Sequence, residues 1–162
     1  MVEMVVVMLI MGIFAAAAVP TFYDSLLFHR VESAARRVKA DLELVRQTAR
    51  LTSTEQTLTV IGNTYTASPA VAHLDRPTLP YSVDLSKPPY SVVVAANFGG
   101  FTEVRFNGYG TPRRPNGTPL VTGTVIVQSG SHQCTVTLDG ATGQVTMSSN
   151  HTRGRTAKVI GM

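Results

Sequence analysis

The chain of 162 residues has room for one modest domain and a short additional segment, and its nonpolar residues suffice for a small core. Charged residues make up only 15% of the sequence, and the net charge of +4 permits weak attraction to nucleic acid or anionic lipid without demonstrating either. Because Cys134 is the single cysteine, an intrachain disulfide is excluded, and its alternating apolar surroundings favour a buried thiol.

The chain begins with an apolar segment. From Met4 to Val19 no residue carries a charge, and Pro20 closes the run. As a helix, these sixteen residues would span roughly 24 Å, slightly less than the hydrocarbon core of a bilayer, which is about 30 Å thick. Glu3 borders the run, where its carboxylate either lies at the level of the lipid headgroups or has a paired, functional role.

A helical pattern continues after Pro20, which would kink or locally open the helix without stopping it. Apolar residues recur at steps of three and four along one face: Leu27, Val31, Ala34 or Ala35, Val38, Leu42, Val45 and Ala49. On the other face, opposite charges stand four residues apart in the pairs Glu32–Arg36, Arg37–Asp41 and Lys39–Glu43. These interleaved acids favour a solvated or subunit-packing face over a nucleic-acid patch. Continued to about Thr52, the helix would be roughly 75–80 Å long, as in an anchor whose second half lies against a head domain.

From Glu55 the periodicity changes to two, which indicates short strands bounded by turn residues. The strand-like segments are TLTVIG, TYTAS, YSVVVAA, TEVRFN, GTVIVQS, CTVTLDG and GQVTMS. Asn63 after Gly62 predicts a hairpin turn, and Asp139-Gly140 predicts another. The segment from Ser68 to Pro89 holds five of the nine prolines, and we interpret it as a surface crossing or variable loop. Strands that follow one long helix predict an α+β fold whose head is an antiparallel sheet.

No motif for catalysis or metal binding emerges from the sequence. The histidines lack partners at metal-ligand spacing; they are His29, His73, His132 and His151. The sequence contains no phosphate-binding glycine loop and no Gly-x-Ser-x-Gly elbow. Acidic residues of the head stand singly, so no catalytic carboxylate pair is predicted; they include Asp75, Asp84, Glu103 and Asp139. We therefore expect neither an enzyme nor a bound cofactor or metal.

The N-terminus resembles that of type IV pilins and type II secretion pseudopilins. The resemblance is carried by Glu3, the unbroken apolar run, Gly12, the alanine-rich stretch and Pro20, seventeen residues after the glutamate. In that family the mature chain begins Phe-Thr-Leu-Val-Glu, after a short basic leader that ends in glycine. Met1-Val2-Glu3 matches only the last part of this pattern, and a native start that lies upstream, with the leader, would produce this N-terminus.

The resemblance implies a structural subunit whose single transmembrane helix lies in the bacterial inner membrane, with the head in the periplasm or in a fibre. A prepilin peptidase would remove the leader, and the first mature residue would be methylated. The partners would be membrane lipid and other pilin or pseudopilin subunits, which pack through the N-terminal helix. Glu3 would pair with the N-terminal amine of a neighbour, and Gly12 and Pro20 are the other predicted assembly residues. In a competing hypothesis the chain is a single-span anchored protein unrelated to pili, and Glu3 is incidental.

Later segments narrow the resemblance to the GspH/FimT class of minor pseudopilins. AARRVKADLELVRQTAR, the turn after it and QTLTVIG resemble that class, as do FNGYGTPRRPNGTPLVTGTVIV and CTVTLDGATGQV. The middle of the chain, from about Gly62 to Gly100, matches no family pattern. We therefore expect a transmembrane and assembly half-helix at residues 1–22, an amphipathic half-helix at 23–53, a β-rich head at 54–148 and a basic tail at 149–162.

The tail suggests an alternative function. It carries Arg153, Arg155 and Lys158, and no acid follows Asp139. Some FimT-like minor pilins bind DNA through a basic C-terminal tail with arginines around a glycine, and Arg153-Gly154-Arg155 is similar. The resemblance thus implies a minor pilin for DNA uptake, to which Arg113-Arg114 would contribute if the fold brings them close. A solvated tail is the simpler interpretation, because three phosphate contacts would give only weak, salt-sensitive binding.

Overall fold

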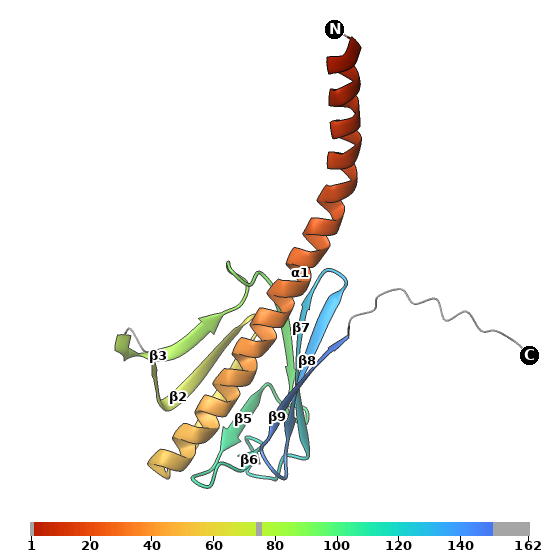
Figure 1. Cartoon of the computed structure of the whole chain (residues 1–162). Helices are drawn as coiled ribbons and strands as arrows, with labels where there is room; N and C mark the ends of the chain where they lie inside the picture. Colours follow the sequence, from red (N-terminus) through yellow and green to blue (C-terminus); the bar gives the residue numbers. More distant parts are fainter. Residues whose placement is uncertain (1, 74–75, 151–162) are drawn as a thin grey trace, which may run out of the picture.

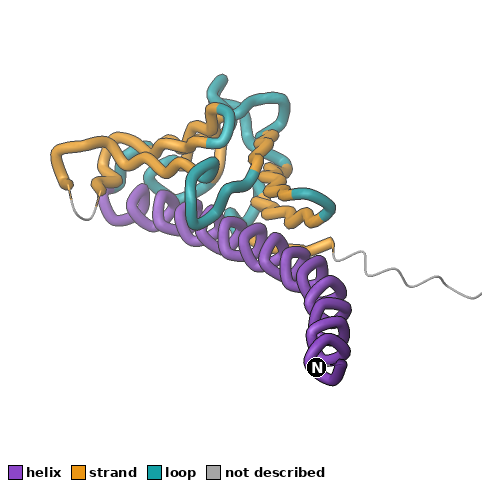
Figure 2. The backbone as a smooth tube through the Cα atoms, turned by 90° about the horizontal axis from the view of Figure 1, so that it is seen from above, coloured by secondary structure: helices purple, strands orange, loops and turns teal. Residues whose placement is uncertain are grey.

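A single long helix dominates the structure, a computed structural model that describes residues 2–73 and 76–150 and omits the side chains of 13–21, 69–70 and 72–79. Helix α1 runs without interruption over Val2–Thr52. Its 51 residues correspond to about 76 Å, and it continues through Pro20 as predicted. Figures 1 and 2 show that its N-terminal part projects beyond the strands and is bent relative to the part that packs on them.

The second half of α1 has the predicted amphipathic pattern. The predicted apolar face is buried from Val31 onward, and Leu27 at its start is half-buried; the buried members are Val31, Ala34, Ala35, Val38, Leu42, Val45 and Ala49. All three predicted ion pairs form, with nitrogen–oxygen distances of 2.7 Å for Glu32–Arg36, 3.0 Å for Arg37–Asp41 and 3.9 Å for Lys39–Glu43. Burial of the apolar stripe, with a charged face left in solvent, fixes the orientation of the helix on the head.

The strands form two antiparallel sheets in the order β3-β2-β1-β5-β6 and β4-β7-β8-β9. The first sheet consists of β1 (Gln56–Ile61), β2 (Thr64–His73), β3 (Arg76–Asp84), β5 (Glu103–Phe106) and β6 (Pro112–Arg113). The second consists of β4 (Val93–Asn97), β7 (Thr122–Ser129), β8 (His132–Asp139) and β9 (Val145–Asn150). Helix α1 contacts strands of both sheets, so one helix face closes a core shared by the two (Figure 1).

The interpretation of Ser68–Pro89 as a loop is wrong over most of its length. Strand β2 continues to His73, and β3 returns beside it, with Thr64 opposite Asp84 and Ala67 opposite Tyr81. Strand β3 is the outer strand of its sheet, and edge strands are where a sheet accommodates prolines. The pairing also shifts register between Ala67 and Ala72, an irregularity that a simple alternating pattern does not predict.

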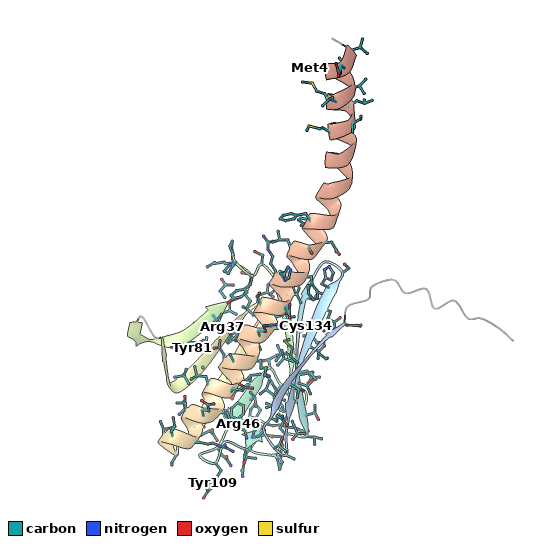
Figure 3. The ribbon with its side chains drawn as sticks, in the orientation of Figure 1. Met4, Arg37, Arg46, Tyr81, Tyr109 and Cys134 are labelled. Carbon is teal, nitrogen blue, oxygen red and sulfur yellow. The ribbon has the colours of Figure 1, made fainter. Side chains whose placement is uncertain are left out.

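A polar cluster ties α1 to the first sheet. Asp41 is 4% exposed, and its carboxylate accepts hydrogen bonds from the Tyr65 hydroxyl on β2 and from Nε of Arg37. Nη2 of Arg37 also donates to the Tyr81 hydroxyl on β3, at 2.7 Å. Burial and the neighbouring Asp41 raise the pKa of Tyr65 well above its ordinary value and that of Tyr81 to about 12. The cluster thus fixes the β2–β3 hairpin against the middle of the helix (Figure 3).

Candidate functional site

The most unusual surface of the molecule is the apolar N-terminal part of α1. On every side of the helix in its first turns, the apolar side chains are 46% to 78% exposed, and this part of α1 projects away from the head (Figure 3). We call them the N-terminal apolar surface; its members are Val2, Met4, Val5, Val6, Val7, Met8, Leu9, Ile10 and Met11. A contiguous exposed apolar surface of this kind marks contact with another protein or with lipid.

The three predicted assembly residues lie on this same part of α1. Glu3 is exposed in the first helical turn, and no described side chain forms an ion pair with it. A Cβ atom added at Gly12 would meet no atom within 4 Å, so the helix surface there is open. Pro20 lies within the continuous helix, but the structure does not describe its side chain. The roles of these residues in assembly remain predictions.

A single transmembrane helix was expected at residues 1–22. In the described part of the chain, no helix is both long enough and apolar enough to cross a membrane.

Where α1 reaches the head, a side-chain contact fixes its direction. Nε2 of His132 lies 2.7 Å from the carboxylate of Asp24, and the ring of Phe28 packs edge-on against His132 with centroids 5.8 Å apart. His132 is 7% exposed, at the start of β8. No local pattern in the sequence indicates this contact, because Asp24 and His132 stand 108 residues apart.

Two arginines hold the other end of α1 to the head. Nη2 of Arg46 donates to the Thr142 carbonyl at 2.7 Å, and Nε of Arg50 donates to the Tyr109 carbonyl at 3.0 Å. The acceptors belong to the β8–β9 turn and to the β5–β6 loop, both of which lie far along the chain from the helix. The part of α1 from Asp24 to Arg50 is thus attached to the head at both of its ends and in the middle, whereas the N-terminal apolar surface projects beyond it.

The residues predicted to bind DNA are only partly placed. Arg153, Arg155 and Lys158 lie outside the described residues. Arg113 is exposed on β6, at the outer edge of the first sheet, whereas Arg114 packs over Gly99, where a Cβ atom would come within 2.5 Å of its Nε. The contribution of Arg113 and Arg114 to DNA binding by the tail therefore remains a prediction.

The remaining candidates for chemistry in the head are metal-binding groups and the Cys134 thiol. Over residues 2–73 and 76–150, no group of three or more histidine, cysteine or acidic side chains gathers as a metal site. Cys134 is 1% exposed, as expected, and its Sγ donates to the Ser148 carbonyl at 3.3 Å. Burial, followed by the nearby charge of Glu32, raises the pKa of this thiol.

Comparison with known proteins identifies the fold. No family model and no curated protein matches the sequence. Two crystal structures of the type IV minor pilin FimU from Pseudomonas aeruginosa superpose on the chain with TM-scores of 0.56 and 0.53, at 13% and 14% identity. The alignments cover 76% and 74% of this chain and 94% and 97% of FimU. The minor pseudopilin EpsH from the type 2 secretion system of Vibrio cholerae gives a TM-score of 0.51 at 14% identity, over 74% of this chain and 97% of EpsH.

These similarities confirm the expected pilin-like α+β fold, in which a long N-terminal helix packs on an antiparallel β head. At such low identities, the comparison establishes the fold and leaves the role of each residue to be argued from the chemistry of its surroundings.

Proposed function

We propose that the protein is a structural subunit, a minor pilin or pseudopilin of a type IV pilus-like fibre or a type II secretion system. The observation that carries the proposal is the N-terminal apolar surface, which projects from the head in a fold shared with FimU and EpsH. The protein acts by assembly and has no catalytic role. Its helix lies in the inner membrane of a bacterium before assembly, and its head lies in the periplasm or the fibre.

The physical reason for assembly is the exposed apolar area. Full burial of a valine, leucine, isoleucine or methionine side chain contributes about 1.5–3 kcal/mol. Each of the nine side chains of the N-terminal apolar surface is at least 46% exposed, so an isolated subunit in water leaves most of this free energy unused. Lipid covers the surface first, and the helices of neighbouring subunits replace the lipid when the fibre forms.

Glu3 has a specific role in this assembly. A carboxylate that becomes enclosed among packed apolar helices is strongly destabilising unless it meets an opposite charge. The N-terminal amine of a neighbouring subunit supplies that charge, and the pair fixes the register of one helix against the next. The processing steps belong to the same proposal: a prepilin peptidase removes an upstream leader, and the new N-terminus is methylated.

Gly12 and Pro20 adapt the helix surface to its neighbours. Small residues allow helix backbones to approach closely in an apolar environment, and the surface at Gly12 is open to such an approach. Pro20 removes one backbone N–H in the region where α1 approaches the head, so the helix bends there with less resistance. In this proposal the assembly segment of α1 ends near residue 22, shortly after Pro20.

The test replaces Glu3 by alanine. We expect the Glu3→Ala variant to reach the membrane fraction at the wild-type level, because the apolar side chains are intact, but to be excluded from fibres. The matched control is Glu55→Ala, which removes an exposed carboxylate on the head that lies 3.5 Å from Arg105. Fibre incorporation is measured by cross-linking between subunits. Normal incorporation of Glu3→Ala would overturn the proposed role of Glu3.

A second candidate function is DNA capture for uptake, which the cluster of Arg153, Arg155 and Lys158 favours. Three phosphate contacts predict that the logarithm of the binding constant falls with the logarithm of salt concentration with a slope of about −3. We expect the variant with all three residues changed to alanine to lose this binding. The control variant changes Arg30, Arg36 and Lys39 on α1 to alanine and loses the same charge. Equal, negligible binding by wild type and both variants would reject this candidate.

A further inference from the structure

A small hollow lies between α1 and the β8–β9 turn, at the end of the head away from the N-terminal apolar surface. Its volume is about 160 Å³, and it is lined by Glu43, Arg46, Gln47, Arg50, Gln144 and Val145. Figure 3 shows Arg46 on this lower part of the helix, with Met4 at the opposite end of the molecule. Nothing in the proposed assembly function requires two arginines and two carboxamides to meet here.

Arg46 is held in place yet keeps an unused donor. Its Nη2 donates to the Thr142 carbonyl, and its guanidinium packs on Gly143, where a Cβ atom would come within 2.9 Å of Nε. Nε itself is enclosed and has no hydrogen-bond partner among the described residues. An enclosed donor without an acceptor is destabilising, so the protein alone leaves this guanidinium incompletely satisfied.

The charges around the hollow favour an anion. Arg50 stands one helical turn after Arg46 and also lines the hollow, and its Nε donates to the Tyr109 carbonyl, which restrains the second guanidinium. Burial, followed by the like charge of Arg50, lowers the pKa of Arg46. Glu43 opposes this effect, but its carboxylate lies 3.9 Å from Lys39 and forms no ion pair with either arginine among the described residues.

We propose that this hollow is an oxyanion site, in which Arg46 and Arg50 bind a carboxylate or phosphate group. Guanidinium groups match both anions through paired N–H donors, and the carboxamides of Gln47 and Gln144 add uncharged donors. Since a water molecule occupies about 30 Å³, the volume accommodates such a group together with the first atoms attached to it. This inference goes beyond the assembly function and does not depend on it.

The two anion classes imply different sources. A carboxylate arrives on an acidic side chain of another protein or another copy of this chain, whereas a phosphate arrives as the free ion or as part of a larger phosphate ester. The shared chemistry is one delocalised negative charge with oxygen acceptors spaced for two N–H donors. Separate titrations with acetate and with inorganic phosphate distinguish the two sources.

The experiment follows the Nε–Hε resonances of Arg46 and Arg50 by NMR in the full chain, kept monomeric in a neutral detergent. Inorganic phosphate or acetate replaces chloride at constant ionic strength, so that general salt screening is unchanged. We expect a saturable shift of both resonances. Saturation with acetate at concentrations similar to phosphate indicates a carboxylate-bearing ligand, and saturation with phosphate alone indicates a phosphate ligand. The absence of any saturable shift with either anion overturns the proposal.

The decisive variant is Gln144→Glu, which has the same shape as the wild type but places a carboxylate in the hollow. We expect it to bind the anion at least about tenfold more weakly, because the new charge occupies the arginines. Gln128→Glu on β7 is the matched control, with the same change of charge on an exposed residue elsewhere. Unchanged affinity of Gln144→Glu, or equal weakening in Gln128→Glu, contradicts the proposed site. Since Gln144 is exposed, we expect Gln144→Glu to fold like the wild type, so weaker binding would not reflect unfolding.

Discussion

At the scale of single residues, Asp41 has the environment that most needs explanation. A carboxylate that is 4% exposed requires partners, and the Tyr65 hydroxyl and the Arg37 guanidinium supply them. These partners come from the helix itself and from β2, so the cluster specifies how the first sheet sits on α1. The stability of the folded head therefore depends on the tyrosine hydroxyl that donates to Asp41.

Tyr65→Phe tests this dependence. The change removes one hydrogen bond to a buried carboxylate while keeping the aromatic ring, so we expect the free energy of unfolding to fall by about 1.5–3 kcal/mol. Tyr109→Phe is the control: Tyr109 is 84% exposed, and its loss of a hydroxyl should change stability by no more than about 0.5 kcal/mol. Denaturant unfolding of both variants measures the difference. Equal effects of the two would show that the Tyr65 hydroxyl contributes nothing specific.

Tyr81 gives the cluster a dependence on alkaline pH. Its pKa is raised from 10.0 to about 12, so the folded state holds the phenolic proton more tightly than the unfolded chain does. This stabilisation is complete below pH 10 and is lost as the pH rises toward 12. We expect the unfolding free energy to fall over this interval, and to fall less in Tyr81→Phe. Parallel pH profiles of wild type and variant, measured by urea unfolding, would contradict this assignment.

At the scale of elements, the sequence predicted the parts whose patterns are local. The helix followed from an apolar repeat at steps of three and four, and seven strands followed from alternation, because burial of one face imposes those periods. Strand β3 was missed because prolines obscured an alternation in which Tyr81 and Leu85 are buried and Val83 is partly buried. An edge position, which is a property of the assembled sheet, makes those prolines acceptable.

The contacts that fix α1 to the head could not be predicted in this way. Asp24 meets His132, and Arg46 meets the Thr142 carbonyl, across separations of 108 and 96 residues. Charged residues on a helix face predict only local pairs four residues apart, all three of which form. The assembly residues Glu3, Gly12 and Pro20 were identified through a family resemblance, and their roles await experiment.

The β8–β9 turn shows how closely one element is fitted to another. An added Cβ at Gly140 would lie 1.8 Å from the Leu120 carbonyl oxygen, which belongs to the segment before β7. Since backbone must move to make room, we expect Gly140→Ala to lower the unfolding free energy by about 3 kcal/mol or more. Gly12→Ala, where the added atom meets open space, should not lower the thermal midpoint of the head. An unaltered midpoint in Gly140→Ala would show that the turn moves freely.

At the scale of the whole molecule, one helix serves two separate purposes. From Val31 to Ala49 one apolar stripe of α1 is buried in the core of the head, whereas from Val2 to Met11 the apolar side chains are exposed. A helix that is apolar on all sides is typically covered on all sides, by lipid or by other helices. The head therefore needs only the second half of α1 for its stability, and the proposed assembly needs the first.

This division predicts that stability and self-association can be altered independently. Val5 and Leu9 are 67% and 65% exposed on adjacent turns of one helix face. We expect the Val5→Ser/Leu9→Ser double variant to keep the thermal midpoint of the head while its self-association in detergent, measured by sedimentation, becomes weaker. The polar hydroxyls lower the gain from burying this face against another helix.

Val38→Ser is the reciprocal change. Val38 is 3% exposed, and replacing it leaves a cavity and a buried hydroxyl, which together cost about 2–4 kcal/mol of head stability. We expect its thermal midpoint to fall by roughly 5–15 °C, while self-association of the folded fraction below that midpoint is unchanged. The two halves of α1 would be acting as one unit if the Val5→Ser/Leu9→Ser variant also lost head stability. The same would follow if Val38→Ser weakened self-association as much as the double variant does. Separate responses would instead show that the head is a folded body carried on an independent assembly helix.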